Sequence, residues 1–288
     1  MLKSTTSKIV AAVSSLILLT GVALASPPLQ TATLSTPDTV GTLSLPPAAD
    51  NSPVISLGTA VDPGTGQVVE GLAIIHRKSS PARPGKPKPG TDTCYTYLSS
   101  GAKWKTVEPW IVNPANLDNI GVGTSSANLV FNILDNGVSK WEDATDGVLG
   151  NGGVDVLGPG TTTSATLVAN TASPDNQNEV YFADISDPGV IAVTIVWGIF
   201  GGPPFGRELV EWDQVYDDVS FDWSAESGGV ADKMDLDNIA THELGHSVGM
   251  GDLYNTCVDE TMYGYSANAE TKKRDLNTGD IKGANALY

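Results

Sequence analysis

The order of the expected elements predicts an α+β domain, in which helices cover a twisted, mixed sheet. Runs of β-branched and aromatic residues between residues 107 and 217 indicate strands, and apolar residues recur at helical spacing both within and after this stretch. The chain of 288 residues is 40% hydrophobic and 17% charged, so it can bury a large core. We therefore expect one large domain, preceded by a segment of different composition.

Five short segments are expected to form strands. They span residues 107–112, 154–157, 179–185, 190–197 and 207–217. Pro109 lacks an amide donor, which favours an edge position for the first strand. The last two strands are expected to pair with each other, and residues 161–171 are ambiguous.

Three segments are expected to form helices. They span residues 124–143, 235–250 and 280–288. Thr124 or Ser125 would cap the first helix, and Asn136-Gly137 would kink or shorten it. The second helix begins with acidic side chains, which the helix dipole favours in a first turn.

The start of the chain resembles an export signal. Lys3 and Lys8 precede an apolar run over residues 9–25 that ends in Ala-Leu-Ala, so residues 1–25 are expected to be a signal peptide cut after Ala25. The alternative is a membrane anchor, for which the run is slightly short. We therefore expect a secreted protein without stable membrane insertion.

The next segment, residues 26–93, is rich in proline. It holds 11 of the 18 prolines, so it is expected to be a propeptide or linker. A turn at residues 62–66 followed by an apolar run over residues 67–76 indicates one small hairpin within it. Residues 94–288 are assigned to the folded domain.

Charge is divided unevenly along the chain. The net charge is −17, which excludes a typical nucleic-acid-binding protein. Residues 1–90 carry a net charge of +3 and residues 91–288 one of −20, so the two parts could attract each other. Acidic residues at 184–187 and 213–222 are interpreted as a solvated surface, with a calcium site as the alternative.

Two of the three histidines, His242 and His246, lie four residues apart in an expected helix. At this spacing their imidazoles face the same way and can bind one metal ion. Glu243 is placed to act as a general base on a water at that metal. Gly249 can end the helix in a left-handed turn, which would return Asp252 as a third ligand. This set is typical of one catalytic zinc ion; the alternative is an exposed helix with incidental histidines.

The pattern His-Glu-x-x-His-x-x-Gly-x-x-Asp over residues 242–252 resembles the extended zinc signature of the metzincin metalloproteases. Residues 261–265 are similar to the family's Met-turn, in which Met262 would lie beneath the metal. The Met-Tyr step and residues 280–288 are most similar to the matrixin branch. The resemblance covers roughly residues 104–288, and it implies a zincin fold with a twisted five-stranded mixed sheet, two long helices and a C-terminal helix.

The resemblance implies a zinc-dependent endopeptidase that acts on protein or peptide substrates. Glu243 would take a proton from zinc-bound water, which attacks the peptide carbonyl, and would pass it to the leaving amine. The substrate would lie extended along an edge strand, for which residues 190–197 are the candidate. Tyr263 and Tyr265 would form the wall of the main side-chain pocket, with core packing as an equal alternative.

The sequence departs from the family pattern in places. Asp252 stands where a third histidine is usual, as it does in a few branches such as the snapalysins. Only His76 remains outside the signature, so the second, structural zinc of matrixins is not expected. His76 itself falls before the catalytic region and is interpreted as an ordinary strand residue.

The chain has two cysteines, Cys94 and Cys257. In an exported protein such a pair most simply forms a disulfide. The alternative is that Cys94 blocks the zinc, although the usual propeptide cysteine motif is not recognisable.

Two other functions compete with a monomeric secreted endopeptidase. One is a zinc-binding but non-proteolytic surface or adhesion module on a protease scaffold, and the other is a hydrolase of a non-peptide substrate. Glu243 weighs against the first, because a pure binding module needs no base beside the metal.

Overall fold

The computed structural model describes residues 41–46, 52–78, 93–115, 117, 120, 126–254 and 256–288. These residues belong to one unit of the chain, Thr39–Tyr288. Several expected features lie outside the described residues. They are the signal peptide, the proline-rich residues 79–92, and the caps Thr124 and Ser125.

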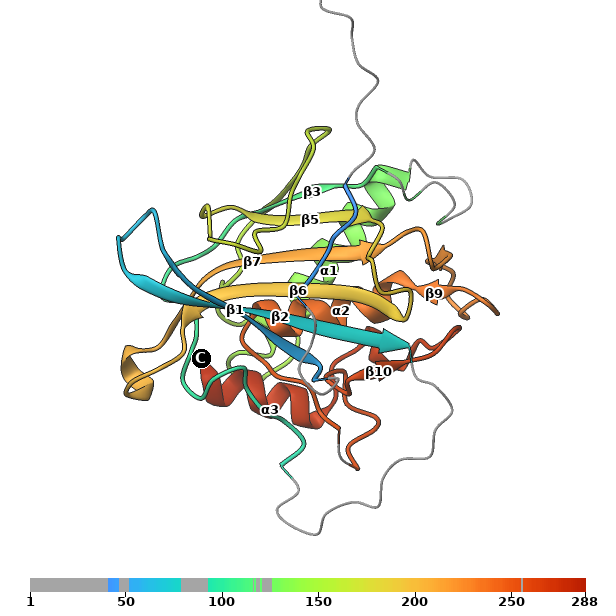
Figure 1. Ribbon diagram of the computed structural model, residues 1–288. Helices are drawn as coiled ribbons and strands as arrows, with labels where there is room; N and C mark the ends of the chain where they lie inside the picture. The colour runs from blue at the N-terminus through green and yellow to red at the C-terminus, as the bar shows by residue number, and fades with distance from the viewer. Residues whose placement is uncertain are drawn as a thin grey trace, which may run out of the picture. The chain divides into compact units, whose positions relative to one another are not determined.

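In the described part of the chain, eight strands form one sheet (Figure 1). They are β1 (Val54–Val61), β2 (Val68–Lys78), β3 (Trp110–Asn113), β4 (Gly160–Thr162), β5 (Asn178–Ala183), β6 (Val190–Ile199), β7 (Glu208–Asp217) and β10 (Tyr265–Ser266). The order across the sheet is β1-β2-β6-β7-β5-β3-β4, and β10 pairs with β2. A separate small pair is formed by β8 (Trp223–Ser224) and β9 (Met234–Asp235).

The sheet is mixed. Strands β4, β3, β5 and β7 run parallel to one another, whereas β6 is antiparallel to β7. The predicted α+β class with a mixed sheet is therefore confirmed. The sheet is wider than expected because β1, β2, β4 and β10 join the four expected strands that form, β3, β5, β6 and β7.

The helices pack against the sheet (Figure 1). They are α1 (Ser126–Asp143), α2 (Leu236–Ser247) and α3 (Thr278–Leu287), with short 3₁₀ turns η2 (Pro204–Gly206) and η3 (Lys272–Arg274). Helix α1 continues through Gly137 to Asp143, so the expectation of a helix shortened there is wrong. A Cβ at Gly137 would lie 2.6 Å from Cδ1 of Leu244, so the glycine lets α1 approach α2 closely.

Two further expectations for strands are wrong. Residues 154–157 form no strand, because the amides of Val156 and Leu157 donate to Oε1 of Glu142 at 2.8 and 2.9 Å. Strand β3 begins after Pro109 and lies between β5 and β4, so it is not at an edge. The proline precedes the strand and removes no hydrogen bond from it.

The expected hairpin is formed by β1 and β2, and it is part of the main sheet. The amides of Gly64 and Thr65 donate to the carboxylate of Asp62 at 2.9 and 3.0 Å, which closes the turn. Strand β2 then pairs antiparallel with β6, from Glu70 opposite Gly198 to Arg77 opposite Val190. Strand β6 is therefore interior, and the expectation of an exposed edge strand at residues 190–197 is wrong.

The sheet separates two apolar cores. All six tryptophans are buried. Among the described residues, no helix has both the length and the apolarity that crossing a membrane requires.

A buried carboxylate on β7 predicts a pH effect on stability. The side chain of Glu211 is fully buried and accepts hydrogen bonds from Asn170 and from the amides of Asp175 and Asn176. Burial raises the pKa of Glu211 from 4.5 to about 7, although these hydrogen bonds act in the opposite direction. Between those two pH values the folded chain binds more protons than the unfolded chain, so the free energy of unfolding falls as the pH rises.

Glu211→Gln removes this titration. Relative to the parent chain, the variant is expected to gain stability between pH 5 and pH 8, by a few degrees in Tm. The measurement is thermal unfolding by circular dichroism at both pH values, with Glu70→Gln on the exposed side of β2 as the control. A difference in Tm that does not change with pH would contradict the prediction.

Candidate metal centre

Helix α2 holds both histidines of the signature. Its N-cap Asp235 accepts a hydrogen bond from the amide of Asn238 at 2.9 Å, which satisfies one of the free donors of the first turn. The helix ends at Ser247, and Gly249 follows with φ of 101°. A Cβ on Gly249 would lie 3.0 Å from the carbonyl oxygen of Ala102, so both the backbone angle and the space require glycine. The chain can therefore turn back towards the helix.

The two imidazoles are oriented by backbone carbonyls. Nδ1 of His242 lies 2.6 Å from the carbonyl oxygen of Thr261, and Nδ1 of His246 lies 3.0 Å from that of Met250. Because a carbonyl oxygen only accepts, each Nδ1 carries the proton and donates it. Each Nε2 is then left with a lone pair, which is the form that binds a metal.

Asp252 lies opposite these lone pairs. Its Oδ1 is 3.2 Å from Nε2 of His242 and 3.5 Å from Nε2 of His246. All three atoms are buried and lack a hydrogen-bond partner. Two ligands that each lie about 2.0–2.1 Å from a tetrahedral zinc ion are about 3.3–3.4 Å apart. The three residues therefore fit one zinc ion.

The charge states suit such an ion. Burial would raise the pKa of Asp252, but the charges of His246 and His242 outweigh it and the pKa is lowered. Burial lowers the pKa of His242 to about 4. The hydroxyl of Tyr254 donates to Oδ2 of Asp252 at 2.9 Å, which leaves Oδ1 facing the imidazoles. An ionised carboxylate thus faces the Nε2 atoms of the two imidazoles, and metal binding requires those nitrogens unprotonated.

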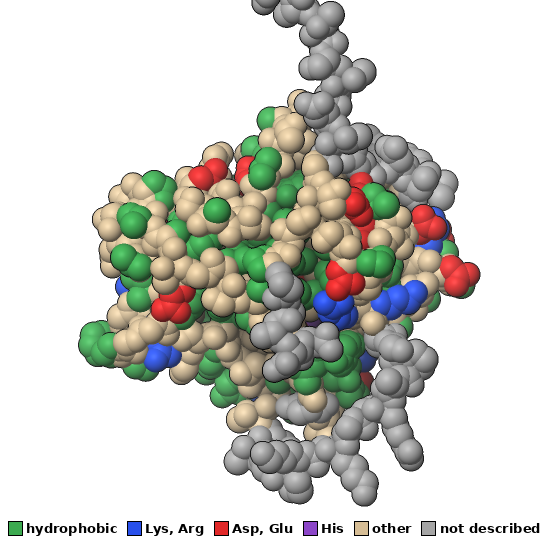
Figure 2. Space-filling model, in the orientation of Figure 1, with side chains coloured by type: hydrophobic (Ala, Val, Ile, Leu, Met, Phe, Trp, Pro, Cys, Tyr) green, Lys and Arg blue, Asp and Glu red, His purple; other side chains and the backbone are tan. Residues whose placement is uncertain are grey.

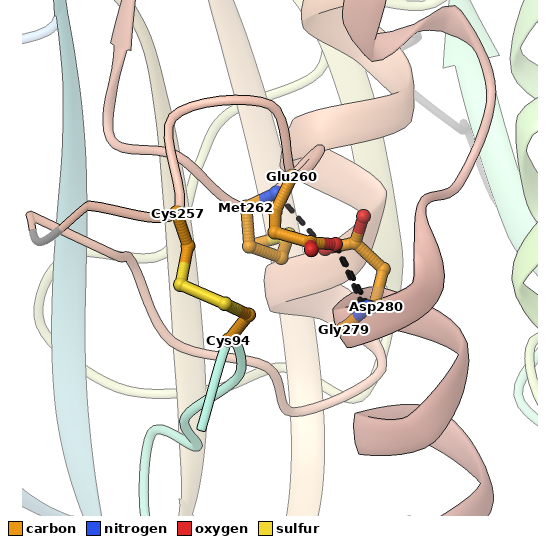
Figure 3. Close-up of a disulfide and its surroundings, with 6 residues drawn as sticks. All are labelled: Cys94, Cys257, Glu260, Met262, Gly279 and Asp280. Carbon is orange, nitrogen blue, oxygen red and sulfur yellow. Dashed lines mark hydrogen bonds between the residues drawn. A yellow bond between two sulfur atoms is a disulfide. The ribbon is translucent and has the colours of Figure 1, made fainter. Parts of the chain in front are cut away.

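Met262 lies against α2 between the two histidines. It is fully buried, and a Cβ on Gly245 would lie 2.2 Å from its Sδ, so the glycine makes room for the sulfur. The carboxylate of Asp280 in α3 accepts from the amide of Thr261 at 2.8 Å. It also accepts from the amide of Met262 at 3.2 Å (Figure 3). Helix α3 therefore fixes the turn that carries Met262.

A disulfide joins Cys94 to Cys257 on the same loop (Figure 3). Close by, Glu260 accepts from the amides of Gly279 and Asp280 at 2.9 and 3.2 Å. With its sulfur bonded to Cys257, Cys94 is not a metal ligand in this structure. The alternative in which Cys94 blocks the zinc is therefore wrong for this state.

Glu243 is fully buried and bonded at both oxygens. Oγ1 of Thr194, on β6, donates to Oε2 at 2.6 Å, and Nδ1 of His76 lies 2.8 Å from Oε1. Burial raises the pKa of Glu243 to about 8, although the bond from Thr194 acts in the opposite direction. Sequence reasoning missed Thr194, whose position in an apolar run gave no sign of this contact.

His76 is the most important residue that sequence reasoning misplaced. It lies on β2 and is fully buried, with its ring centre 4.0 Å from that of His242. Its Nε2 is 3.4 Å from Nζ of Lys273, which can only donate, so Nδ1 carries the proton and donates to Glu243. His76 therefore belongs to the site, and the interpretation as an ordinary strand residue outside it is wrong. The available signal was that it is the one histidine outside the signature.

Lys273 is a buried cation at the far side of His76. Its Nζ donates to the carbonyl of Tyr263, and to the carbonyl of Tyr265 and Oγ of Ser266 at 2.9 Å each. Burial lowers its pKa to about 8. The lysine thus ties the segment after Met262 to the site.

The two tyrosines expected in a pocket wall lie differently. Tyr265 borders a pocket of about 150 Å³. The pocket is lined by Pro53, Ile75, Arg77, Tyr254, Gly264 and Tyr265. Tyr263 is not part of that lining, and its ring lies under the ammonium of Lys272. Three of the six lining residues come from β2 or directly precede β1: Ile75, Arg77 and Pro53.

Asp213 and Asp217 are fully buried, so the interpretation of the acidic residues at 213–222 as a solvated surface is wrong for these two. Among the described residues, the acidic groups at 184–187 and 213–222 form no metal set comparable to the candidate zinc ligands. Acidic side chains on the face in Figure 2 lie in several separate places. Within the described residues, the two sets of three that could hold a metal ion are His76-His242-Glu243 and His242-His246-Asp252. A calcium site therefore stays a prediction. One ion pair does join the basic front segment to the acidic domain, between Arg77 and Asp187 at 2.7 Å.

A buried glutamate beside two helix-borne imidazoles, above a methionine turn, defines a metzincin-type site. The comparisons agree with this class: residues 162–288 match the family model of the matrixins, Peptidase M10. Over that part the chain is similar to the matrixin branch of the metzincins, a family of zinc metalloproteases. The match leaves out the hairpin and α1. No curated protein matches the chain.

Proposed function

We propose that the protein is a secreted zinc-dependent endopeptidase, in which His242, His246 and Asp252 hold one zinc ion. The observation that carries the proposal is the convergence of three buried atoms without hydrogen-bond partners, two imidazole nitrogens and one carboxylate oxygen. A buried glutamate next to this set supports hydrolysis rather than simple metal storage.

A zinc ion bound here would supply a Lewis acid that polarises a peptide carbonyl and acidifies a water. Glu243 would take a proton from the attacking water as the new C–O bond forms, and would deliver it to the leaving nitrogen as the C–N bond breaks. Thr194 donates to Oε2 of Glu243, so it orients Oε1 for this transfer. Tyr254 orients Asp252 in the same way.

The competing function is a zinc-binding module without proteolytic activity. A carboxylate that is fully buried and shared between a hydroxyl and an imidazole has no role in such a module. Burial of an acid without need is costly, so its presence favours an enzyme.

The test combines metal analysis with digestion of an unfolded protein. We expect about one zinc ion per chain, and casein digestion that a chelator abolishes and added zinc restores. Digestion that continues in excess chelator, or a purified chain that binds no zinc, would contradict the proposal.

Secretion is supported by the sequence of residues 1–25 alone. Expression with export should yield a mature chain that begins at Ser26, as read by N-terminal sequencing. Retention of Met1 on exported, membrane-bound protein would favour the anchor instead.

A further inference from the structure

Strand β2 runs through the metal site with a partner on each side. It is antiparallel to β6, and it is parallel to β10, where Tyr265 lies opposite Arg77. On the side away from β6, β1 pairs with residues 68–74 of β2, and β10 pairs with its last two residues, Arg77 and Lys78. Strand β10 begins three residues after Met262, and β6 carries Thr194, which bonds Glu243. An extended peptide that binds by strand addition needs the edges of β6 and β10, and β2 already occupies both (Figure 1).

The side chain that β2 places in the site is His76. It donates to Oε1 of Glu243 at 2.8 Å, packs on the ring of His242, and faces Lys273 through its other nitrogen. This oxygen of Glu243 is the one that Thr194 leaves free. While His76 donates to it, this oxygen is a weaker proton acceptor, and the imidazole stands where an attacking water would have to approach.

The hairpin also fits β6 tightly. A Cβ on Gly71 would lie 2.7 Å from Cη2 of Trp197, which is fully buried. The glycine therefore allows β2 to lie directly over the indole ring. The contact is specific, because any larger residue would push β2 away from β6.

We propose that the hairpin Val54–Lys78 is an intramolecular inhibitor, in which β2 takes the place of the substrate strand and His76 withholds Glu243. This inference rests on the proposed endopeptidase function. The occupant it replaces is an extended peptide bound between β6 and β10. The hairpin is linked to the rest of the domain through residues 79–92, so a cut in that stretch leaves it held by non-covalent contacts alone.

The experiment uses the full chain with the recognition sequence of a site-specific protease inserted between Gly85 and Lys86. A tethered strand competes at an effective concentration on the order of mM, and cutting lowers this to the actual protein concentration. We expect the cut, diluted and zinc-loaded chain to cleave a fluorogenic peptide at least about 10-fold faster than the uncut chain. In parallel, the β6 amides paired with β2 should lose protection from hydrogen exchange, which is also measured on metal-free protein.

Gly71→Ala gives a second route to release. The added methyl group meets Trp197, so the uncut variant should already be faster than the uncut parent chain. Glu70→Ala, at an exposed position on the same strand, is the matched control and should behave like the parent chain. Circular dichroism checks that both variants stay folded.

Adding the strand back tests the role of His76. A synthetic peptide of residues 52–78 should inhibit the cut chain. The same peptide with His76→Ala should be about 10- to 100-fold weaker, because it leaves a buried oxygen of Glu243 without its partner. The peptide with Glu70→Ala should match the unchanged peptide.

The outcomes separate the two proposals. If uncut and cut chains cleave equally fast although β6 has become exposed, the inhibitor is wrong and the endopeptidase stands. If neither form cleaves with zinc bound and β6 exposed, the endopeptidase is wrong. Equal inhibition by the His76→Ala and unchanged peptides would remove His76 from the inhibitory contact.

Discussion

Glu243→Gln is expected to lower peptide cleavage by about 10²- to 10⁴-fold in the released form, while one zinc ion stays bound. Glutamine keeps the shape of the side chain and can still accept from Thr194, but it cannot take a proton from water. The reaction would then lose its base without losing its metal. Cleavage is measured with a fluorogenic peptide, and zinc by mass spectrometry of the metal.

Glu211→Gln is the matched control for this variant. Glu211 is also a fully buried glutamate, but its partners are Asn170 and the backbone at residues 175–176. It should retain cleavage close to that of the parent chain. Full activity in Glu243→Gln would show that some other group serves as the base.

Asp252→Ala is expected to weaken zinc binding by at least about 100-fold, because even the outer partners of metal ligands are worth 10- to 100-fold. The variant leaves two imidazoles and an open side, which is too few ligands for a stable zinc site. Competition with a coloured zinc chelator measures the affinity. Asp252→His should recover much of it, since histidine also offers a nitrogen to zinc.

Tyr254→Phe is the control for Asp252. It removes the bond to Oδ2 but keeps the carboxylate, so its effect should be smaller, at about 10-fold. Unchanged zinc affinity in Asp252→Ala would remove this residue from the ligand set.

The proximity of the candidate metal ligands could be predicted because their contacts are local. His242, Glu243 and His246 lie within one helix, and Gly249 returns Asp252 within a few residues. Periodicity and turn chemistry are enough to bring such residues together. Most strands of the central sheet could also be predicted, because local alternation and residue type are enough to indicate a strand.

His76 could not be placed in this way, because it meets Glu243 across 167 positions. No spacing rule connects such residues, and the pairing of β2 with β6 must be known first. One signal for that pairing was present in β6, where nine of the ten residues are buried. A continuous apolar run is typical of an interior strand with both faces covered, and not of an exposed edge.

Prediction from local strand propensity was also wrong where a side chain accepts the hydrogen bonds of backbone amides. Val154 and Val156 favour a strand, but Glu142 accepts from the amides of Val156 and Leu157 and leaves no partner strand. Gly137 was expected to kink or shorten the first helix, whereas the helix continues through it and the glycine leaves room for Leu244.

The position of the hairpin near the start of the chain has a consequence for biosynthesis. Ribosomes make β1 and β2 before β6 and α2, and a hairpin closes locally and fast whereas long-range pairing is slow. Strand β2 is thus already formed when the ribosome releases α2, which carries the candidate metal ligands. Under the proposed inhibition by β2, an enzyme assembled in this order would not expose an uninhibited active site inside the producing cell.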